Sequence, residues 1–212
     1  MKNFKAREAA FLGILTFIFL TGFAIGQVNA RGTQLSIIPA TLTVGAEGQP
    51  LPTEPFTINI TLTDFEDVYT WQIRILFNPS ILKCTAAWYP ADHIFTGKTT
   101  APVQPVIDNT AGSILFGNSL VGEVPGVSGS KATLCQINFT GVAVGSSQIT
   151  FQLTGTGRTL LLDSNGGFIE FTANPGEVTV VPEFPSILML TILLATSTGL
   201  LLSKKFAKKP KY

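Results

Sequence analysis

The sequence Trp71-Gln72-Ile73-Arg74-Ile75-Leu76-Phe77, followed by the turn pair Asn78-Pro79, indicates the fold class of this chain. The apolar residues Trp71, Ile73, Ile75 and Phe77 recur at every second position. This period is typical of a β-strand with one face buried. The same alternation recurs in residues 56–62 and 148–153, and no stretch between the two ends of the chain has the period of a helix.

Shorter strand signals fill the rest of the interior and are separated by turn residues, chiefly glycine, asparagine and proline. Many short strands with turns between them indicate an all-β antiparallel sandwich. No internal repeat or linker divides the region, so we expect one domain over residues 31–181. The expected shorter strands are 35–38, 41–44, 81–85, 103–107, 113–120, 133–141, 159–162, 168–171 and 177–180.

The charges are unevenly distributed along the chain. Residues 31–181 hold 11 acidic and 6 basic residues, a balance of −5, whereas residues 1–30 carry +2 and residues 182–212 carry +4, which restores the net charge of +1. Nucleic-acid binding requires a basic face. A mildly acidic middle therefore argues against a nucleic-acid partner.

The N-terminus has the layout of a secretory signal peptide. Basic residues in 1–10 precede the apolar run 11–20, and Val28-Asn29-Ala30 provides small residues at a cleavage point. This order is typical of an export signal. We predict a signal peptide over residues 1–30; the alternative is an uncleaved N-terminal anchor.

The C-terminus reads as a membrane anchor. Residues 187–203 carry no charge, and five lysines follow in 204–212. A long apolar run followed by lysines predicts a transmembrane helix with its C-terminal tail in the cytoplasm. We therefore expect a membrane-bound protein at the cell surface, with its domain extracellular.

A proline-rich segment, 182–186, precedes the predicted helix. Its residues Pro182, Glu183, Phe184 and Pro185 resemble the PEF-type sorting signals of archaeal surface proteins. The resemblance implies an archaeal source, and it leaves open whether a sorting transpeptidase replaces the helix with a lipid.

Two cysteines lie in the expected extracellular domain. Cys84 shares strand parity with Leu82, and Cys135 shares it with Ile137 and Phe139, so both should face the core. An even pair outside the cell favours a disulfide; the alternative is two buried thiols. Asn59-Ile60-Thr61 and Asn138-Phe139-Thr140 are glycosylation sequons. By parity Asn59 and Asn138 should face solvent.

Residues 69–84 (YTWQIRILFNPSILKC) resemble the signature stretch of cohesin domains, in which a strand ends in an aromatic-Asp/Asn-Pro-Ser turn. Residues 44–62 and 133–142 are similar to flanking strands of that family. The sequence departs from the family in Asn78, where aspartate is commoner, in its two cysteines, and in the insertion-like stretch 86–105. The resemblance implies a jelly-roll sandwich of about nine strands that binds a dockerin-type helical module; related sandwiches bind polysaccharide.

One cluster of side chains looks like a ligand site, namely Trp88, Tyr89, Asp92 and His93. Its aromatics could stack on a sugar or cap the core. His93 is the only imidazole, and no nucleophile motif or phosphate loop occurs, so we expect no enzyme activity and no cofactor. The acidic stretch 64–67 (DFED) could ligate calcium through its carboxylates, and the alternative is a solvated turn. Three functions stay open: a cohesin-like docking module, a carbohydrate-binding sandwich used in polysaccharide breakdown, and a structural component of the cell envelope.

Overall fold

The computed structural model describes residues 32–45 and 51–181, together with residues 194 and 196. The predicted signal peptide, sorting motif and basic tail lie outside the described residues. Of the predicted membrane span, only Leu194 and Thr196 are described, and both are helical. No helix within the described residues has the length and apolar character needed to cross a bilayer.

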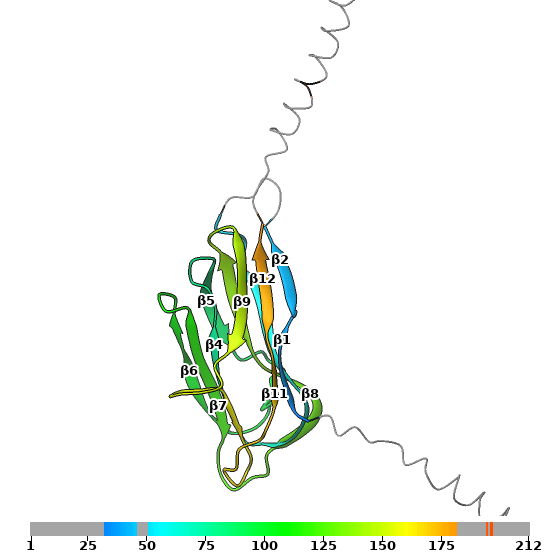
Figure 1. Cartoon of the computed structure of the whole chain (residues 1–212). Helices are drawn as coiled ribbons and strands as arrows, with labels where there is room; N and C mark the ends of the chain where they lie inside the picture. The colour runs from blue at the N-terminus through cyan, green and yellow to red at the C-terminus, as the bar shows by residue number, and fades with distance from the viewer. Residues whose placement is uncertain (1–31, 46–50, 182–193, 195, 197–212) are drawn as a thin grey trace, which may run out of the picture. The chain divides into compact units, whose positions relative to one another are not determined.

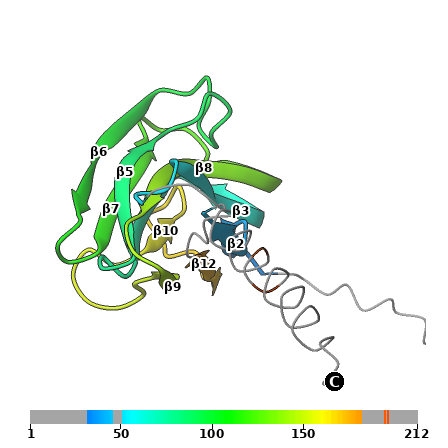
Figure 2. The same cartoon turned by 90° about the horizontal axis from the view of Figure 1, so that it is seen from above.

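Two β-sheets pack face to face (Figures 1 and 2). The first has five strands in the order β11-β1-β3-β8-β5. The second has seven, in the order β2-β12-β9-β4-β7-β6, with β10 also paired to β4. The strands are β1 (Gln34–Ile38), β2 (Thr41–Val44), β3 (Phe56–Val68), β4 (Thr70–Leu76), β5 (Leu82–Trp88), β6 (Thr100–Asp108), β7 (Ser113–Leu120), β8 (Val127–Gly141), β9 (Gly145–Phe151), β10 (Leu160–Leu162), β11 (Thr172–Asn174) and β12 (Gly176–Val180).

The sandwich is all-β as predicted, but its sheets are mixed rather than antiparallel, and it has more strands than the nine expected. Both terminal segments of the domain cross from one sheet to the other. β1 and β2 flank a break at Pro39-Ala40, and β11 and β12 flank Pro175. Each segment therefore supplies one strand to each sheet, and these strands pair in parallel, β1 with β11 and β2 with β12.

The core between the sheets is built from the alternating apolar residues. Trp71, Ile73 and Ile75 of β4 are fully buried, as the alternation predicts. Aromatic rings pack edge to face at its centre, with Trp71 and Phe116 at 5.7 Å and Phe77 and Phe139 at 5.2 Å between ring centroids. Such pairs add to the stabilisation that burial of apolar area provides.

The predicted disulfide is not formed, although both cysteines are buried as their parity predicts. Cys84 and Cys135 are free thiols. Cys84 on β5 lies opposite Phe139 of β8, whereas Cys135 lies opposite Ile60 of β3. Because Cys135 is four residues from Phe139, and a strand rises about 3.3 Å per residue, the two thiols are too far apart to bond.

Candidate functional site

The outward side of three neighbouring strands, β4, β7 and β6, forms a surface that we call the open face. Residues directly opposite each other on paired strands lie on the same side of a sheet. The register therefore builds three rows across the open face, which are Gln72–Gly117–Val103, Arg74–Leu115–Val106 and Leu76–Ser113–Asp108. The residues between these rows on β4, such as Ile73 and Ile75, point into the core.

The open face is apolar in its middle and carries few charges. Val103 is 51% exposed and Val106 is 60% exposed, and both lie beside partly exposed Leu115. Arg74 and Asp108 are the two charged residues in the three rows. A contiguous exposed apolar surface with charge only at its margin is typical of a protein docking surface.

A loop connecting β9 to β10 borders the open face at β4. The Gln72 side chain donates to the carbonyl of Arg158 at 2.7 Å, and the Arg74 Nε donates to the carbonyl of Gly157 at 2.9 Å. The Arg74 backbone N–H also donates to Thr159 Oγ1 at 2.9 Å. These bonds hold the loop against β4, so the exposed part of the face lies over β7 and β6.

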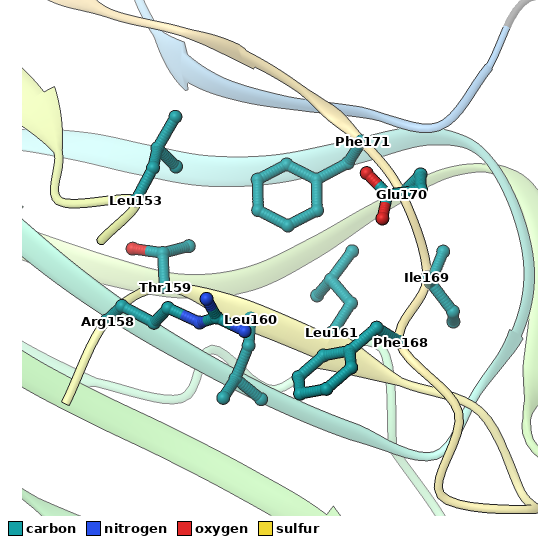
Figure 3. Close-up of a pocket in the computed structure, with 9 residues that line it drawn as sticks. All are labelled: Leu153, Arg158, Thr159, Leu160, Leu161, Phe168, Ile169, Glu170 and Phe171. Atoms are coloured by element: carbon teal, nitrogen blue, oxygen red, sulfur yellow. The ribbon is translucent and has the colours of Figure 1, made fainter. Parts of the chain in front are cut away.

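A hollow of about 260 Å³ lies behind this loop, along β10 (Figure 3). Half-exposed Leu153 and largely exposed Phe168 line it, and the Arg158 guanidinium lies 5.1 Å from the centre of the Phe168 ring. Small-molecule sites usually enclose roughly 300–1,000 Å³ and most of their ligand. This hollow is smaller, and the hydroxyl of Thr159 in its lining is hydrogen-bonded to the backbone of Arg74 and not to Glu170, the one carboxylate of the lining.

The outward side of the five-stranded sheet has a different character, and we call it the polar face. Trp88, Gln136 and Asn59 form one row across β5, β8 and β3, and Asn138 and Thr57 belong to the next. Gln136 donates to Asn59 at 2.9 Å, and Thr57 donates to Asn138 at 2.6 Å. Hydrogen-bonded amides and hydroxyls thus cover the centre of this face.

The two predicted sugar-stacking aromatics are separated by the structure. Trp88 is partly exposed on the polar face, whereas Tyr89 packs against the core. The Tyr89 hydroxyl lies 2.6 Å from the carbonyl oxygen of Gly117 and 2.9 Å from that of Val103. Burial raises the pKa of Tyr89 to about 12. Tyr89 therefore joins the end of β5 to β6 and β7. Of the two aromatic residues, only Trp88 has its ring beside outward-facing polar groups.

Asp92 and His93 lie in the turn that follows β5. His93 Nδ1 accepts a hydrogen bond from the backbone N–H of Phe95 at 3.2 Å, and its ring lies 5.5 Å from that of Tyr89. Burial lowers the pKa of His93, which favours the neutral imidazole. Asp92 is exposed. Within the described residues no side-chain hydrogen bond joins the two, so this turn does not show the base–orienter geometry of an acid–base site.

The acidic stretch proposed for calcium belongs to the end of β3. The Asp67 carboxylate accepts hydrogen bonds from Gly126 N–H at 2.7 Å and from the Ser164 hydroxyl at 2.7 Å. These contacts, led by the Ser164 hydroxyl, lower the pKa of Asp67. No group of three potential ligand side chains gathers around a common point in the part of the chain that the structure describes.

Strand periodicity alone does not predict the open face, although one of its strands carries a signal for it. In β7 (SILFGNSL), Leu115 falls on the same parity as Ser113 and Ser119, so an apolar residue stands on the outward side. In β6 (TAPVQPVID), Val103 and Val106 become neighbours on one side only through a register shift between them. The shift is a property of the paired strands, and parity within β6 alone assigns the two valines to opposite faces.

No protein-family model matches the sequence, and no curated protein matches it either. Solved structures do match the fold. A type II cohesin domain from the cellulosome of Acetivibrio cellulolyticus is 18% identical with a TM-score of 0.54, and the match covers 69% of this chain and 95% of that one. A type I cohesin–dockerin complex from Clostridium thermocellum gives 8% identity and a TM-score of 0.55, over 71% and 94% of the two chains.

An archaeal relative of this fold also matches. The non-cellulosomal cohesin of the hyperthermophilic archaeon Archaeoglobus fulgidus is 11% identical, with a TM-score of 0.50 over 71% of this chain and 92% of that one. At identities this low, the structural match shows the fold alone and leaves the ligand open. The described domain is a β-sandwich with the fold of cohesin domains.

Proposed function

We propose that this protein is a non-catalytic docking module, held at the cell surface, whose open face binds a small helical dockerin-type module on another exported protein. The observation that carries the proposal is the apolar centre of the open face, formed by Val103, Val106 and Leu115, on a domain with the cohesin fold. Solved structures of this fold include cohesin–dockerin complexes. The apolar residues 187–203 and the preceding motif 182–186 would provide the anchor.

A helical partner suits the geometry of the open face. Three rows of side chains on adjacent strands present a broad surface without an enclosed pocket, and a helix can lay an apolar stripe across such a surface. Arg74 and Asp108 lie at its margin, where polar contacts favour orientation and specificity over raw affinity. No aromatic residue stands in the three rows, which makes the face a poor platform for sugar stacking.

Affinity capture with the full chain tests this proposal. Exported proteins of the source organism are passed over immobilised wild type and over Leu115→Asp. A charge placed at the centre of a docking surface costs at least about 2 kcal/mol, or roughly thirtyfold in affinity. We expect a protein with paired helical repeats to be retained by wild type and lost by Leu115→Asp.

The matched control is Thr57→Ala, since Thr57 is exposed on the polar face. It should retain the same partner as wild type. If Leu115→Asp retains the partner while thermal unfolding shows it folded, the open face is not the docking surface and the proposal fails.

A second candidate function, polysaccharide binding, is favoured by one observation. Trp88 shares a row with Gln136 and Asn59, so a partly exposed indole stands beside amide groups on a flat sheet. Affinity electrophoresis on soluble glycans, with Trp88→Ala beside wild type, tests this function. Equal migration of the two proteins on every glycan would rule it out.

A further inference from the structure

Both sequon asparagines lie on the polar face, on the two central strands that pair with each other. Asn59 of β3 is opposite Gln136 of β8, and Asn138 is two residues further along β8. Diagonal neighbours of this kind are about 7–8 Å apart. The two sites are therefore adjacent in the folded domain, although they are 79 residues apart in the sequence.

The two amide groups are held in the same way. Each uses its Oδ1 as an acceptor, Asn59 from Gln136 and Asn138 from Thr57. No hydrogen bond from either Nδ2 occurs among the described residues. The only buried side-chain nitrogen or oxygen without a partner in that part of the chain is Trp71 Nε1. Both Nδ2 atoms therefore reach solvent.

We propose that Asn59 and Asn138 are both N-glycosylated and that the two glycans together cover the polar face. The donor would be an oligosaccharide linked to a polyprenyl phosphate or pyrophosphate. The amide Nδ2 attacks the anomeric carbon of the first sugar, the bond from that carbon to the phosphate oxygen breaks, and the lipid phosphate departs. The amide loses one proton to a base of the transferase.

The folded domain restricts when this transfer can happen. Sequon recognition requires the threonine two residues after each asparagine. Thr61 is 4% exposed and Thr140 is 9% exposed, and the Thr61 hydroxyl donates to the carbonyl of Ser36 on β1. Both sequons also lie within paired strands. The transferase therefore acts on the exported chain before β3 and β8 pair and the two threonines become buried.

Glycans on the polar face leave the open face clear, because the two faces belong to different sheets. Trp88 lies beside Gln136 in the same row as Asn59, so its ring is placed to contact the first sugar of an attached chain.

Mass analysis of the full chain tests the proposal. The chain is exported by a host that glycosylates Asn-X-Thr sequons, and a second exported protein with a known occupied sequon reports that the host pathway works. We expect glycan masses on the peptides containing Asn59 and Asn138, and none on Asn78, whose Asn-Pro-Ser sequence is excluded by its proline. Asn59→Gln and Asn138→Gln should each remove one mass; Thr61→Val and Thr140→Val should do the same while keeping the asparagine.

A cell-free transfer reaction tests the timing. With transferase and lipid-linked donor, denatured chain should be modified and refolded chain should not. An unmodified chain from a host that glycosylates the reporter protein overturns the proposal, and so does modification of one site alone. Equal modification of refolded and denatured chain overturns the order of transfer and folding.

Discussion

Asn109 binds Cys84 through both backbone groups of the cysteine. The Cys84 N–H donates to Asn109 Oδ1 at 2.8 Å, and Asn109 Nδ2 donates to the Cys84 carbonyl at 2.9 Å. β5 is the edge strand of its sheet, and its register with β8 shifts between Cys84 and Ala86. The side chain of Asn109, from the turn between β6 and β7, thus makes the backbone hydrogen bonds that a neighbouring strand would make with β5 at Cys84. It also ties the two sheets together.

Asn109→Ala should destabilise the domain. The change removes two hydrogen bonds and leaves two backbone groups of a partly buried strand without partners, a loss of about 2 kcal/mol. Urea unfolding should show a lower midpoint with an unchanged slope. Thr110→Ala, at the exposed neighbouring residue, is the matched control and should unfold like wild type. Equal midpoints for the two variants would mean that Asn109 does not hold the edge.

Periodicity in the sequence predicts the strands whose inner faces are buried and whose ends are marked by turns. β7 has the predicted bounds of 113–120, and the alternating apolar residues Trp71, Ile73 and Ile75 of β4 point inward. β3 is predicted to end near residue 62 but continues to Val68. Asp64 and Asp67 both adopt left-handed backbone angles, with φ of 51° and 53°. Aspartate tolerates this conformation, so a sequence that reads as a turn is accommodated as irregular strand.

Residues 168–171 are predicted to form a strand because they are largely apolar, but they do not form one. Only Phe168 makes an isolated bridge, to Leu162, and the segment lines the hollow beside β10. The residues of the candidate sites are also predictable only in part. Residue type identifies Trp88 and the two sequons. The open face and the proximity of Asn59 to Asn138 depend on strand pairing and register, and the composition of a single strand determines neither.

The two thiols should be unreactive in the folded protein. Burial raises the pKa of Cys84 to about 12 and raises that of Cys135 well above its usual value, so neither forms thiolate near neutral pH. We expect no maleimide adduct on native protein and two adducts in concentrated urea, measured by intact mass. Cys84→Ala and Cys135→Ala should each show one adduct in urea. A mass two hydrogen atoms below that of the reduced chain would show a disulfide and contradict the register of β5 on β8.

Tyr89→Phe should weaken the domain and change its response to alkali. The loss of the hydroxyl contacts with Gly117 and Val103 costs about 1–2 kcal/mol near neutral pH. Burial raises the folded-state pKa of Tyr89 from 10.0 to about 12, so its contribution is complete below pH 10 and is lost as the pH rises towards 12. The free energy of unfolding of wild type should therefore fall over this range more steeply than that of Tyr89→Phe. Parallel pH profiles would show that the phenol is exposed.

The Asp67 carboxylate joins the segment entering β8 to the turn that follows β10, and its loss should loosen both contacts. The carboxylate binds Gly126 and Ser164, and the backbone N–H of Asp67 donates to Ser128 Oγ at 2.9 Å. A Cβ at Gly126 would lie 2.4 Å from the Asp67 backbone, so these segments approach as closely as glycine allows. In Asp67→Asn, an amide N–H₂ group faces the N–H or hydroxyl donors of this site, so hydrogen bonds of the carboxylate are lost. We therefore expect faster protease cleavage within residues 152–167.

The acid profile of the same variant provides an independent measurement. The folded-state pKa of Asp67 lies below its usual value of 3.8, with the Ser164 hydroxyl as the main cause. Its contribution to stability is thus present above that pH and lost as the pH falls through the folded-state pKa. Asp67→Asn should flatten this part of the profile. Asp64→Asn is the control, because Asp64 has the same left-handed backbone and its carboxylate makes no hydrogen bond among the described residues. Equal cleavage rates for the two variants would show that the Asp67 carboxylate does not hold the contacts with Gly126 and Ser164.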